Sequence, residues 1–75
     1  MSYYEEKRRV FNHIEKLLKR SEEGIEEDFL IYDITKRFTI GEFTIKKRIK
    51  LLEKIKLIEN IGGVILWKKE ASQNQ

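Results

Sequence analysis

The sequence predicts a mainly helical α+β domain in which three helices precede a C-terminal two-stranded β-hairpin. Three observations support this fold class. Apolar residues recur at helical spacing in three successive segments, residues 38–41 break the pattern between the second and third, and β-branched runs flank Gly62 and Gly63. A chain of 75 residues can bury only one small core. We therefore expect a single domain over residues 1–70, followed by a frayed polar tail at residues 71–75.

A first helix is expected to begin at Tyr3, because Ser2 and Glu5 have the spacing of a capping box. Apolar residues then recur on one helical face: they are Val10, Phe11, Ile14, Leu17 and Leu18. Gly24 supplies the stop signal for this helix.

A second helix is expected near the acidic residues 26–28, whose carboxylates suit the positive end of a helix dipole. Its apolar positions are Phe29, Leu30, Ile31, Ile34 and Phe38. Its start is left open, because Ile25 or residues 29–31 could instead form a short strand before a later helix. The acidic run lacks the glycine spacing of a calcium loop and a third cluster of ligands, so we expect no metal site.

The third helix is expected from Glu42 to Ile55, after a turn in which Gly41 either takes unusual backbone angles or caps the helix. Its three core residues fall within about 60° of one another on a helical wheel: they are Ile45, Ile49 and Leu52. The opposite side carries one aromatic residue and four lysines: Phe43, Lys46, Lys47, Lys50 and Lys54. The apolar face is therefore expected to pack in the core, and the lysine-bearing face is expected to attract an anionic partner.

Charge is distributed unevenly along the chain, although the formal net charge is only +3. Residues 1–33 hold six basic and nine acidic side chains, for a net charge of −3. Residues 34–75 hold ten basic and four acidic side chains, for a net charge of +6. A chain with one basic half is a better candidate for nucleic-acid binding than its net charge suggests. The alternative is a charged surface that serves only solvation.

Several classes of protein are disfavoured by what the sequence lacks. It contains no cysteine, which excludes disulfides and cysteine-based zinc sites. It shows no signal-peptide pattern, and no apolar run exceeds four residues. We expect a cytoplasmic protein without a membrane partner, and its Lys, Glu and Ile usage resembles that of thermophiles. His13 has no triad or ligand pattern around it, so we expect no enzyme activity. We also predict no cofactor and no small-molecule ligand.

Segments between Ile34 and Trp67 carry a family pattern. They are Ile34 to Phe38, Thr39-Ile40-Gly41, Thr44-Ile45, Ile49, Leu52-Glu53-Lys54, Leu57-Ile58-Glu59, Gly62-Gly63 and Trp67. Together they resemble the winged helix-turn-helix domains of small archaeal and bacterial transcriptional regulators. The resemblance implies binding to double-stranded DNA, with the third helix in the major groove and the hairpin wing along the backbone or minor groove.

The predicted DNA-binding residues lie mainly in the third helix and the wing. They are Lys36, Glu42, Phe43, Thr44, Lys46, Lys47, Lys50, Lys54, Gly62, Gly63 and Lys68. Lysine is a flexible point charge, so these lysines are expected to follow phosphates rather than to read bases. Thr44 matches a position that often bonds phosphate in the family. Phe43 either touches a thymine methyl group, folds back onto Ile40 or meets a partner subunit.

Three features depart from the family pattern. Lys56 stands where the family usually has glycine, which makes a left-handed helix exit costlier by about 1 kcal/mol or implies a different exit. Glu42 places a negative charge where phosphate is expected. The wing tip, residues 60–64, contains no Lys or Arg, so it contributes either backbone amides or little to DNA contacts, and its only nearby cations are Lys68 and Lys69.

The hairpin is apolar on both faces, because Ile65 and Trp67 alternate with Val64 and Leu66. Either the first helix of the same chain or a second subunit is expected to cover the second face. We predict a homodimer, with these interface residues: Tyr3, Tyr4, Leu51, Ile55, Ile65 and Trp67. The alternative to DNA binding is a winged-helix module for protein–protein interaction in a larger assembly.

Overall fold

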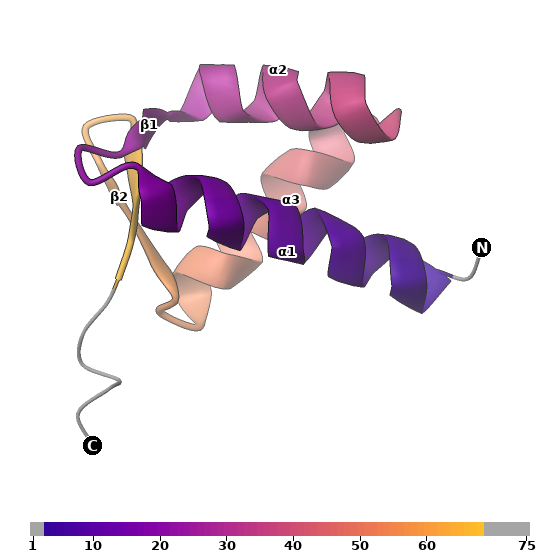
Figure 1. Cartoon of the computed structure of the whole chain (residues 1–75), viewed down its shortest axis with the longest axis horizontal. Coiled ribbons are helices and arrows are strands. Elements are labelled where there is room, and N and C mark those ends of the chain that lie inside the picture. The colour runs from indigo at the N-terminus through magenta and orange to yellow at the C-terminus, as the bar shows by residue number, and fades with distance from the viewer. Residues whose placement is uncertain (1–2, 69–75) are drawn as a thin grey trace.

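The computed structural model describes residues 3–68, together with the side chains of residues 5–68. In chain order its elements are α1 (Tyr3–Arg20), β1 (Ile25–Glu26), α2 (Glu27–Phe38), α3 (Glu42–Lys54), β2 (Ile58–Ile61) and β3 (Val64–Trp67) (Figure 1). The predicted fold class is confirmed as mainly helical α+β. The layout is that of a helix-turn-helix unit, formed by α2 and α3, followed by a β-hairpin in the position of a wing.

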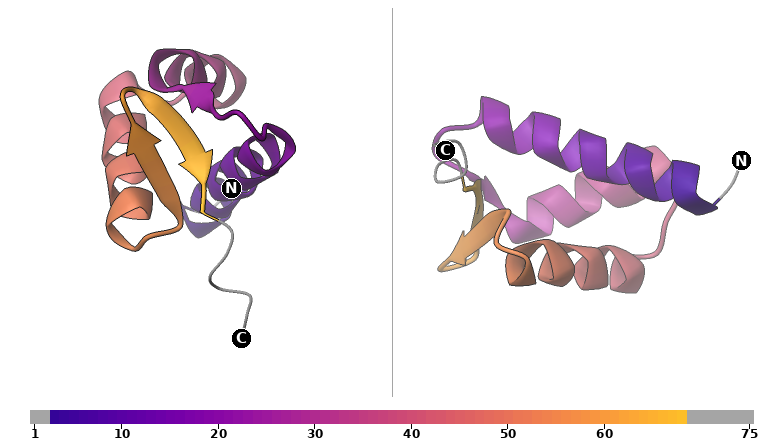
Figure 2. Two further views of the ribbon diagram at one scale, coloured as in Figure 1. Left: turned by 90° about the vertical axis from the view of Figure 1, so that its left-hand side faces the viewer. Right: turned by 90° about the horizontal axis from the view of Figure 1, so that it is seen from below.

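The sheet has three antiparallel strands in the order β1-β3-β2, one more than the sequence predicted. The hairpin turns at Gly62 and Gly63 as expected, and it pairs Ile61 with Val64 at its tip. The added strand pairs Ile25 with Ile65, so a short strand does precede the second helix, but that helix still begins within the acidic run, at Glu27, and not later. Figure 2 shows that this small sheet closes one end of the layer of helices.

Gly24 has a different role from the one predicted. The first helix begins at Tyr3 as expected, but it ends at Arg20, four residues before the glycine. Gly24 lies in the following turn with a φ of +88°, and a Cβ built on it would meet Val64 Cγ1 at 2.6 Å and the Ile65 carbonyl oxygen at 2.8 Å. Glycine is therefore required here because the turn presses directly against β3.

Within residues 3–68, two residues other than glycine have left-handed backbone angles: Thr39, in the turn before α3, and Lys56, just after α3. Thr39 ends α2 with a φ of 55°, whereas Gly41 has a φ of −64° and is the N-cap of α3. The cap role predicted for Gly41 is confirmed, and the unusual backbone angles belong to Thr39 instead. The helix ends at Lys54, one residue earlier than predicted, and Lys56 takes a φ of 66°. The costlier left-handed exit is therefore the one that the chain uses.

The core combines all three helices with the sheet. Among the described residues, the buried side chains are all apolar: Val10, Ile14, Leu18, Leu30, Ile31, Ile34, Ile45, Ile49, Leu52, Ile58 and Ile65. Each helix contributes residues at the three- and four-residue spacing of one face, which is why the periodicity of the sequence located them. Because Ile45, Ile49 and Leu52 are buried, the opposite face of α3 must point outward.

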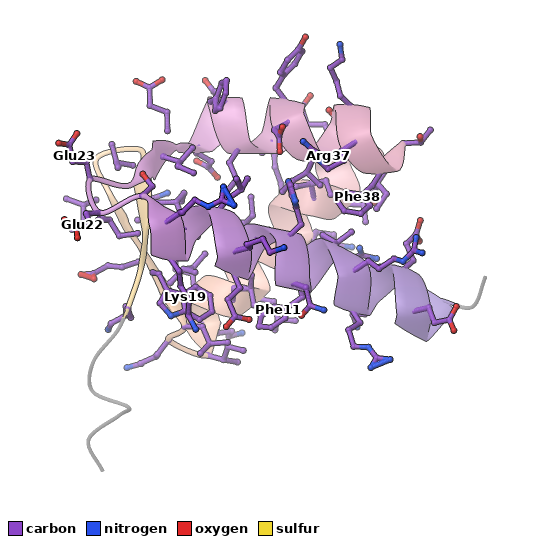
Figure 3. The ribbon with its side chains drawn as sticks, in the orientation of Figure 1. Phe11, Lys19, Glu22, Glu23, Arg37 and Phe38 are labelled. Atoms are coloured by element: carbon purple, nitrogen blue, oxygen red, sulfur yellow. The ribbon has the colours of Figure 1, made fainter. Side chains whose placement is uncertain are left out.

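The first helix of the same chain covers the wing. Ile65 is 0% exposed, so its predicted place in a dimer interface is wrong. The Trp67 ring lies 6.4 Å from the ring of Phe11, and the Lys19 ammonium group lies 5.4 Å from the centre of a Trp67 ring. Figure 3 shows Phe11 and Lys19 on the same side of α1. The first helix of the same chain thus covers part of the second face of the hairpin.

A polar contact joins α1 to α2 on the other side of the core. The distance from His13 Nε2 to Asp33 Oδ2 is 2.7 Å, and Phe38 packs edge-on against the imidazole with ring centres 5.4 Å apart. Arg37 is more loosely paired with the same carboxylate at 3.9 Å. Figure 3 labels Arg37 and Phe38 at the C-terminal part of α2, between that helix and α1. Within residues 3–68, no helix combines the length and the apolar character needed to cross a membrane.

Candidate nucleic-acid interface

The outward face of α3 carries a continuous cationic stripe. Its exposed lysines are Lys46, Lys47, Lys50 and Lys54. They recur at three- and four-residue intervals, so they lie along one side of the helix over its whole length. Thr44, at the edge of this face, is half-buried. The structure therefore brings the predicted residues of this helix onto one accessible surface.

Phe43 is the most accessible of the exposed large apolar residues of the described chain. It is 72% exposed, which excludes the alternative that it folds back onto Ile40. The Lys47 ammonium group lies 5.1 Å from the centre of its ring, within the range of a cation–π contact. This contact positions one lysine beside an apolar group near the N-terminal end of the stripe.

A second aromatic residue with a lysine above it lies on α2 and was missed in the sequence. The Lys36 ammonium group lies 5.3 Å from the centre of the Tyr32 ring, and Tyr32 is itself exposed. Tyr32 also lines a shallow hollow together with Gly41 and Glu42 at the start of α3. The i, i+4 spacing of Tyr32 and Lys36 was the available signal, because residues four apart are neighbours on a helix. Lys36 is thus close to an accessible ring, as Lys47 is.

Carboxylates weaken the positive charge at the N-terminal end of α3. Glu42 Oε2 lies 3.2 Å from Lys46 Nζ, so the first lysine of the stripe is paired within its own helix. Asp28 lines the same hollow as Glu42. No ion pair is formed by Lys47, Lys50 and Lys54 within the described residues, although Glu53 is also exposed on the flank of α3 beside Lys50.

The surroundings of Gly63 at the wing tip do not favour the DNA contact that was predicted for it. The Gly63 N–H donates a hydrogen bond to Asn60 Oδ1 at 2.9 Å, and the Gly63 carbonyl accepts one from the Glu27 N–H at 2.9 Å. Both polar backbone groups of this residue are used within the chain, so Gly63 is not a free amide for phosphate. Three acidic residues border a hollow that also includes Gly62 and Gly63: Glu26, Glu27 and Asp28.

Lys68 lies at the opposite end of the hairpin from these glycines. Its N–H donates to the Leu57 carbonyl at 2.9 Å, just beyond the C-terminal end of α3. Among the predicted wing residues, Lys68 is therefore the one near the cationic end of the helix, and Gly62 and Gly63 are near carboxylates.

The predicted dimer residues do not form one surface. Ile65 is buried and Trp67 packs on Phe11, whereas Leu51 and Ile55 are exposed beside a groove between α1 and α3. The side chains of Tyr3 and Tyr4 lie outside the described residues. Homodimerisation stays a prediction, and among the described residues predicted for the interface Leu51 and Ile55 are the exposed ones.

No group of three His, Asp or Glu side chains within the described part of the chain could hold a metal ion. No known family model matches the sequence, and neither the curated proteins nor the solved structures compared with it gave a match. The geometry of the chain itself must therefore carry any functional argument.

Proposed function

We propose that the protein binds double-stranded DNA with α3 in the major groove and acts as a transcriptional regulator. One observation carries the proposal: the face of α3 opposite its buried residues is a stripe of exposed lysines. The major groove of B-DNA is wide enough to admit an α-helix, and lysines along that helix neutralise phosphates on both of its walls.

The chemistry of the stripe favours affinity over base reading. Lysine lacks the planar fork with which arginine recognises guanine, so these side chains position the protein on the backbone. Phe43 is the apolar side chain on this face that is placed to meet a thymine methyl group. We infer that specificity is modest and depends on this residue and its neighbours at the start of α3.

Charge reversal tests the assignment. The double variant Lys47→Glu with Lys50→Glu should abolish binding in an electrophoretic mobility shift at low salt, because it replaces two attractive charges by two repulsive ones. Both positions are exposed, so thermal unfolding should be little changed.

A matched control is available on α1. Lys16→Glu with Arg20→Glu makes the same change in net charge at two exposed positions of another helix, and it should retain most of the binding. Equal loss in both double variants would show that only net charge matters, and unchanged binding in the α3 variant would refute the assignment.

A protein-interaction module is the second candidate function, and the wing tip favours it. Ile61 is 57% exposed next to a hollow bordered by three carboxylates, a surface that suits an apolar partner better than phosphate. A mobility shift on mixed genomic DNA distinguishes the two functions. Salt-sensitive binding supports the DNA-binding function, whereas no binding even at low salt supports the interaction module.

A further inference from the structure

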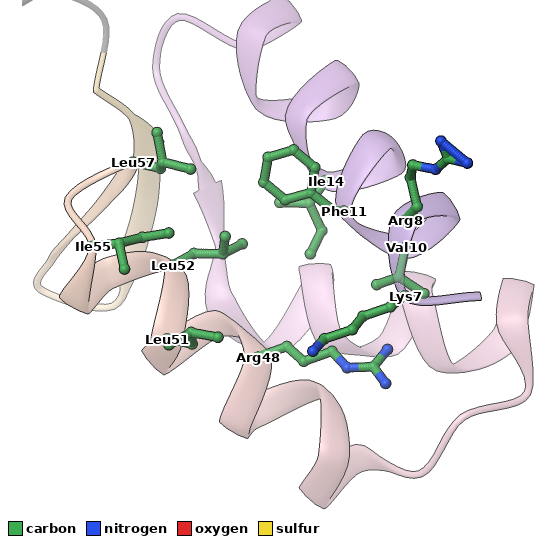
Figure 4. A pocket seen from close by; sticks show the side chains of 10 residues that line it. All are labelled: Lys7, Arg8, Val10, Phe11, Ile14, Arg48, Leu51, Leu52, Ile55 and Leu57. Carbon is green, nitrogen blue, oxygen red and sulfur yellow. The ribbon is translucent and has the colours of Figure 1, made fainter. Parts of the chain in front are cut away.

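An apolar groove of about 520 Å³ lies between α1 and the C-terminal half of α3 (Figure 4). Buried side chains from both helices form its floor: Val10, Ile14 and Leu52. Leu51 and Ile55 stand at its α3 side and are 48% and 54% exposed. Its volume lies in the range of about 300–1,000 Å³ that is usual for small-molecule sites.

The groove is polarised along its length. Its charged lining residues are all cationic, Lys7, Arg8 and Arg48, and no carboxylate lines it. In Figure 4 the ends of Lys7 and Arg48 lie near each other, and Phe11, Ile55 and Leu57 lie toward the other end. One guanidinium nitrogen of Arg48, Nη1, is buried from solvent. Lys7 and Arg48 each also have an interaction within the chain, which a bound anion would join or replace.

We propose that this groove binds an amphipathic carboxylate, a molecule with one carboxylate head and an unbranched hydrocarbon body. The head would lie at Lys7 and Arg48, since a guanidinium group presents the donor geometry that matches a carboxylate and such charge-assisted bonds are strong. The hydrocarbon body would cover the floor and contact Leu51 and Ile55, which removes apolar surface from water.

Charge complementarity favours this occupant over a second copy of the chain. In a two-fold dimer each copy presents the same patch, so the cations of both copies would enter one interface whose lining has no acidic side chain to pair with them. The groove is distinct from the lysine stripe, because Lys47, Lys50 and Lys54 do not line it. Leu51 is nevertheless a helical neighbour of Lys47 and Lys54, so the groove borders the stripe.

Titration with decanoate below its micelle concentration, followed by amide NMR spectra of the whole chain, tests the proposal. Saturable shifts should be confined to residues on α1 and α3 that line the groove. Octanoate, which has two methylenes fewer, should bind roughly fifteenfold more weakly, because each buried methylene contributes about a fourfold change in affinity. Decyltrimethylammonium, which has the same body and a cationic head, should bind far more weakly than decanoate.

Variants locate the site. Ile55→Gln should weaken decanoate binding at least tenfold, whereas Ile61→Gln, at a similarly exposed isoleucine of the wing, should leave it unchanged. Lys7→Gln with Arg48→Gln should remove the preference for decanoate over decyltrimethylammonium. Circular dichroism of each variant checks that it is folded.

Four results would overturn the proposal: absence of saturable binding, equal binding of the cationic amphiphile, equal effects of the two isoleucine variants, or sedimentation as a dimer that Ile55→Gln dissociates. The last would assign the groove to a second copy. Loss of DNA binding in the α3 charge variant bears on none of these results, so the two proposals fail separately.

Discussion

At the scale of single residues, two backbone angles hold α3 in place. Thr39 and Lys56 both adopt left-handed conformations, with φ values of 55° and 66°, and they lie before and after the helix that carries the lysine stripe. A left-handed residue with a side chain costs roughly 1–2 kcal/mol. The chain therefore carries this cost once at the C-cap of α2 and once at the exit from α3.

Lys56→Gly should therefore stabilise the protein. Glycine adopts the observed φ without steric cost, and the expected gain is up to about 1 kcal/mol after the greater freedom of glycine in the unfolded chain is subtracted. Lys50→Gly, at an exposed position inside α3, is the control and should destabilise by about 1 kcal/mol. Urea unfolding of both variants measures the difference, and a loss of stability in Lys56→Gly would contradict the account of this turn.

At the scale of elements, the periodicity of apolar residues predicted the three helices and the hairpin, whereas strand β1 depends on contacts between distant parts of the chain. The three helices and the hairpin each contain enough residues to show a period of 3.6 or 2. Strand β1 has only two residues, Ile25 and Glu26, so no period reveals it. Its pairing with β3 depends on a contact 40 positions away in the chain, Ile25 with Ile65.

For the candidate site, too, the parts that follow from helical spacing were predictable, and the parts that depend on contacts between elements were not. The lysine stripe follows from helical spacing alone, and the structure places it where the sequence predicted. The burial of Ile65 was not predictable, because alternation along a strand shows which residues share a face but not which element packs against that face. The hydrogen bonds of Gly63 were not predictable either, because they depend on how the turn folds. Tyr32 was not predicted, although its i, i+4 spacing from Lys36 makes the two side chains neighbours on α2.

Gly24 tests the contact between the turn after α1 and the sheet. Gly24→Ala should destabilise by about 2 kcal/mol or more, since it combines a left-handed alanine with overpacking against Val64 and a backbone carbonyl. Gly41→Ala is the matched control, because a Cβ there meets nothing within 4 Å and its φ is −64°. Thermal unfolding that shows equal stability for the two variants would mean that the turn moves aside without cost.

At the scale of the whole molecule, the acidic run at residues 26–28 and the lysine stripe of α3 lie at different places on the surface, although Glu42 and Glu53 are also exposed on α3. The acidic residues 26–28 border the wing tip, and the lysines of α3 continue toward Lys68 at the base of the wing. An approaching polyanion therefore meets an attractive side and a repulsive one, which orients it before contact. We infer that the C-terminal part of α3 and the base of the wing lie closest to the phosphates, with the wing tip turned away.

This orientation predicts how DNA affinity depends on salt. If Lys47, Lys50 and Lys54 each neutralise one phosphate and Lys46 contributes partly, the plot of log K against log salt concentration should have a slope of about −3 to −4, since each phosphate contributes about −0.9. Lys50→Gln should make the slope shallower by about 1. Lys46→Gln should change it less, because Glu42 already pairs with Lys46 at 3.2 Å.

Fluorescence anisotropy with a labelled duplex over a range of salt concentrations measures these slopes, with Arg20→Gln as the control on α1. The slope of the control should equal that of the unmodified protein, because Arg20 lies at the end of a different helix. If Arg20→Gln and Lys50→Gln changed the slope equally, the phosphates would be neutralised by the whole basic surface. If Lys46→Gln had the larger effect, the N-terminal end of α3 would be the part closest to the backbone, opposite to the orientation inferred from the carboxylates.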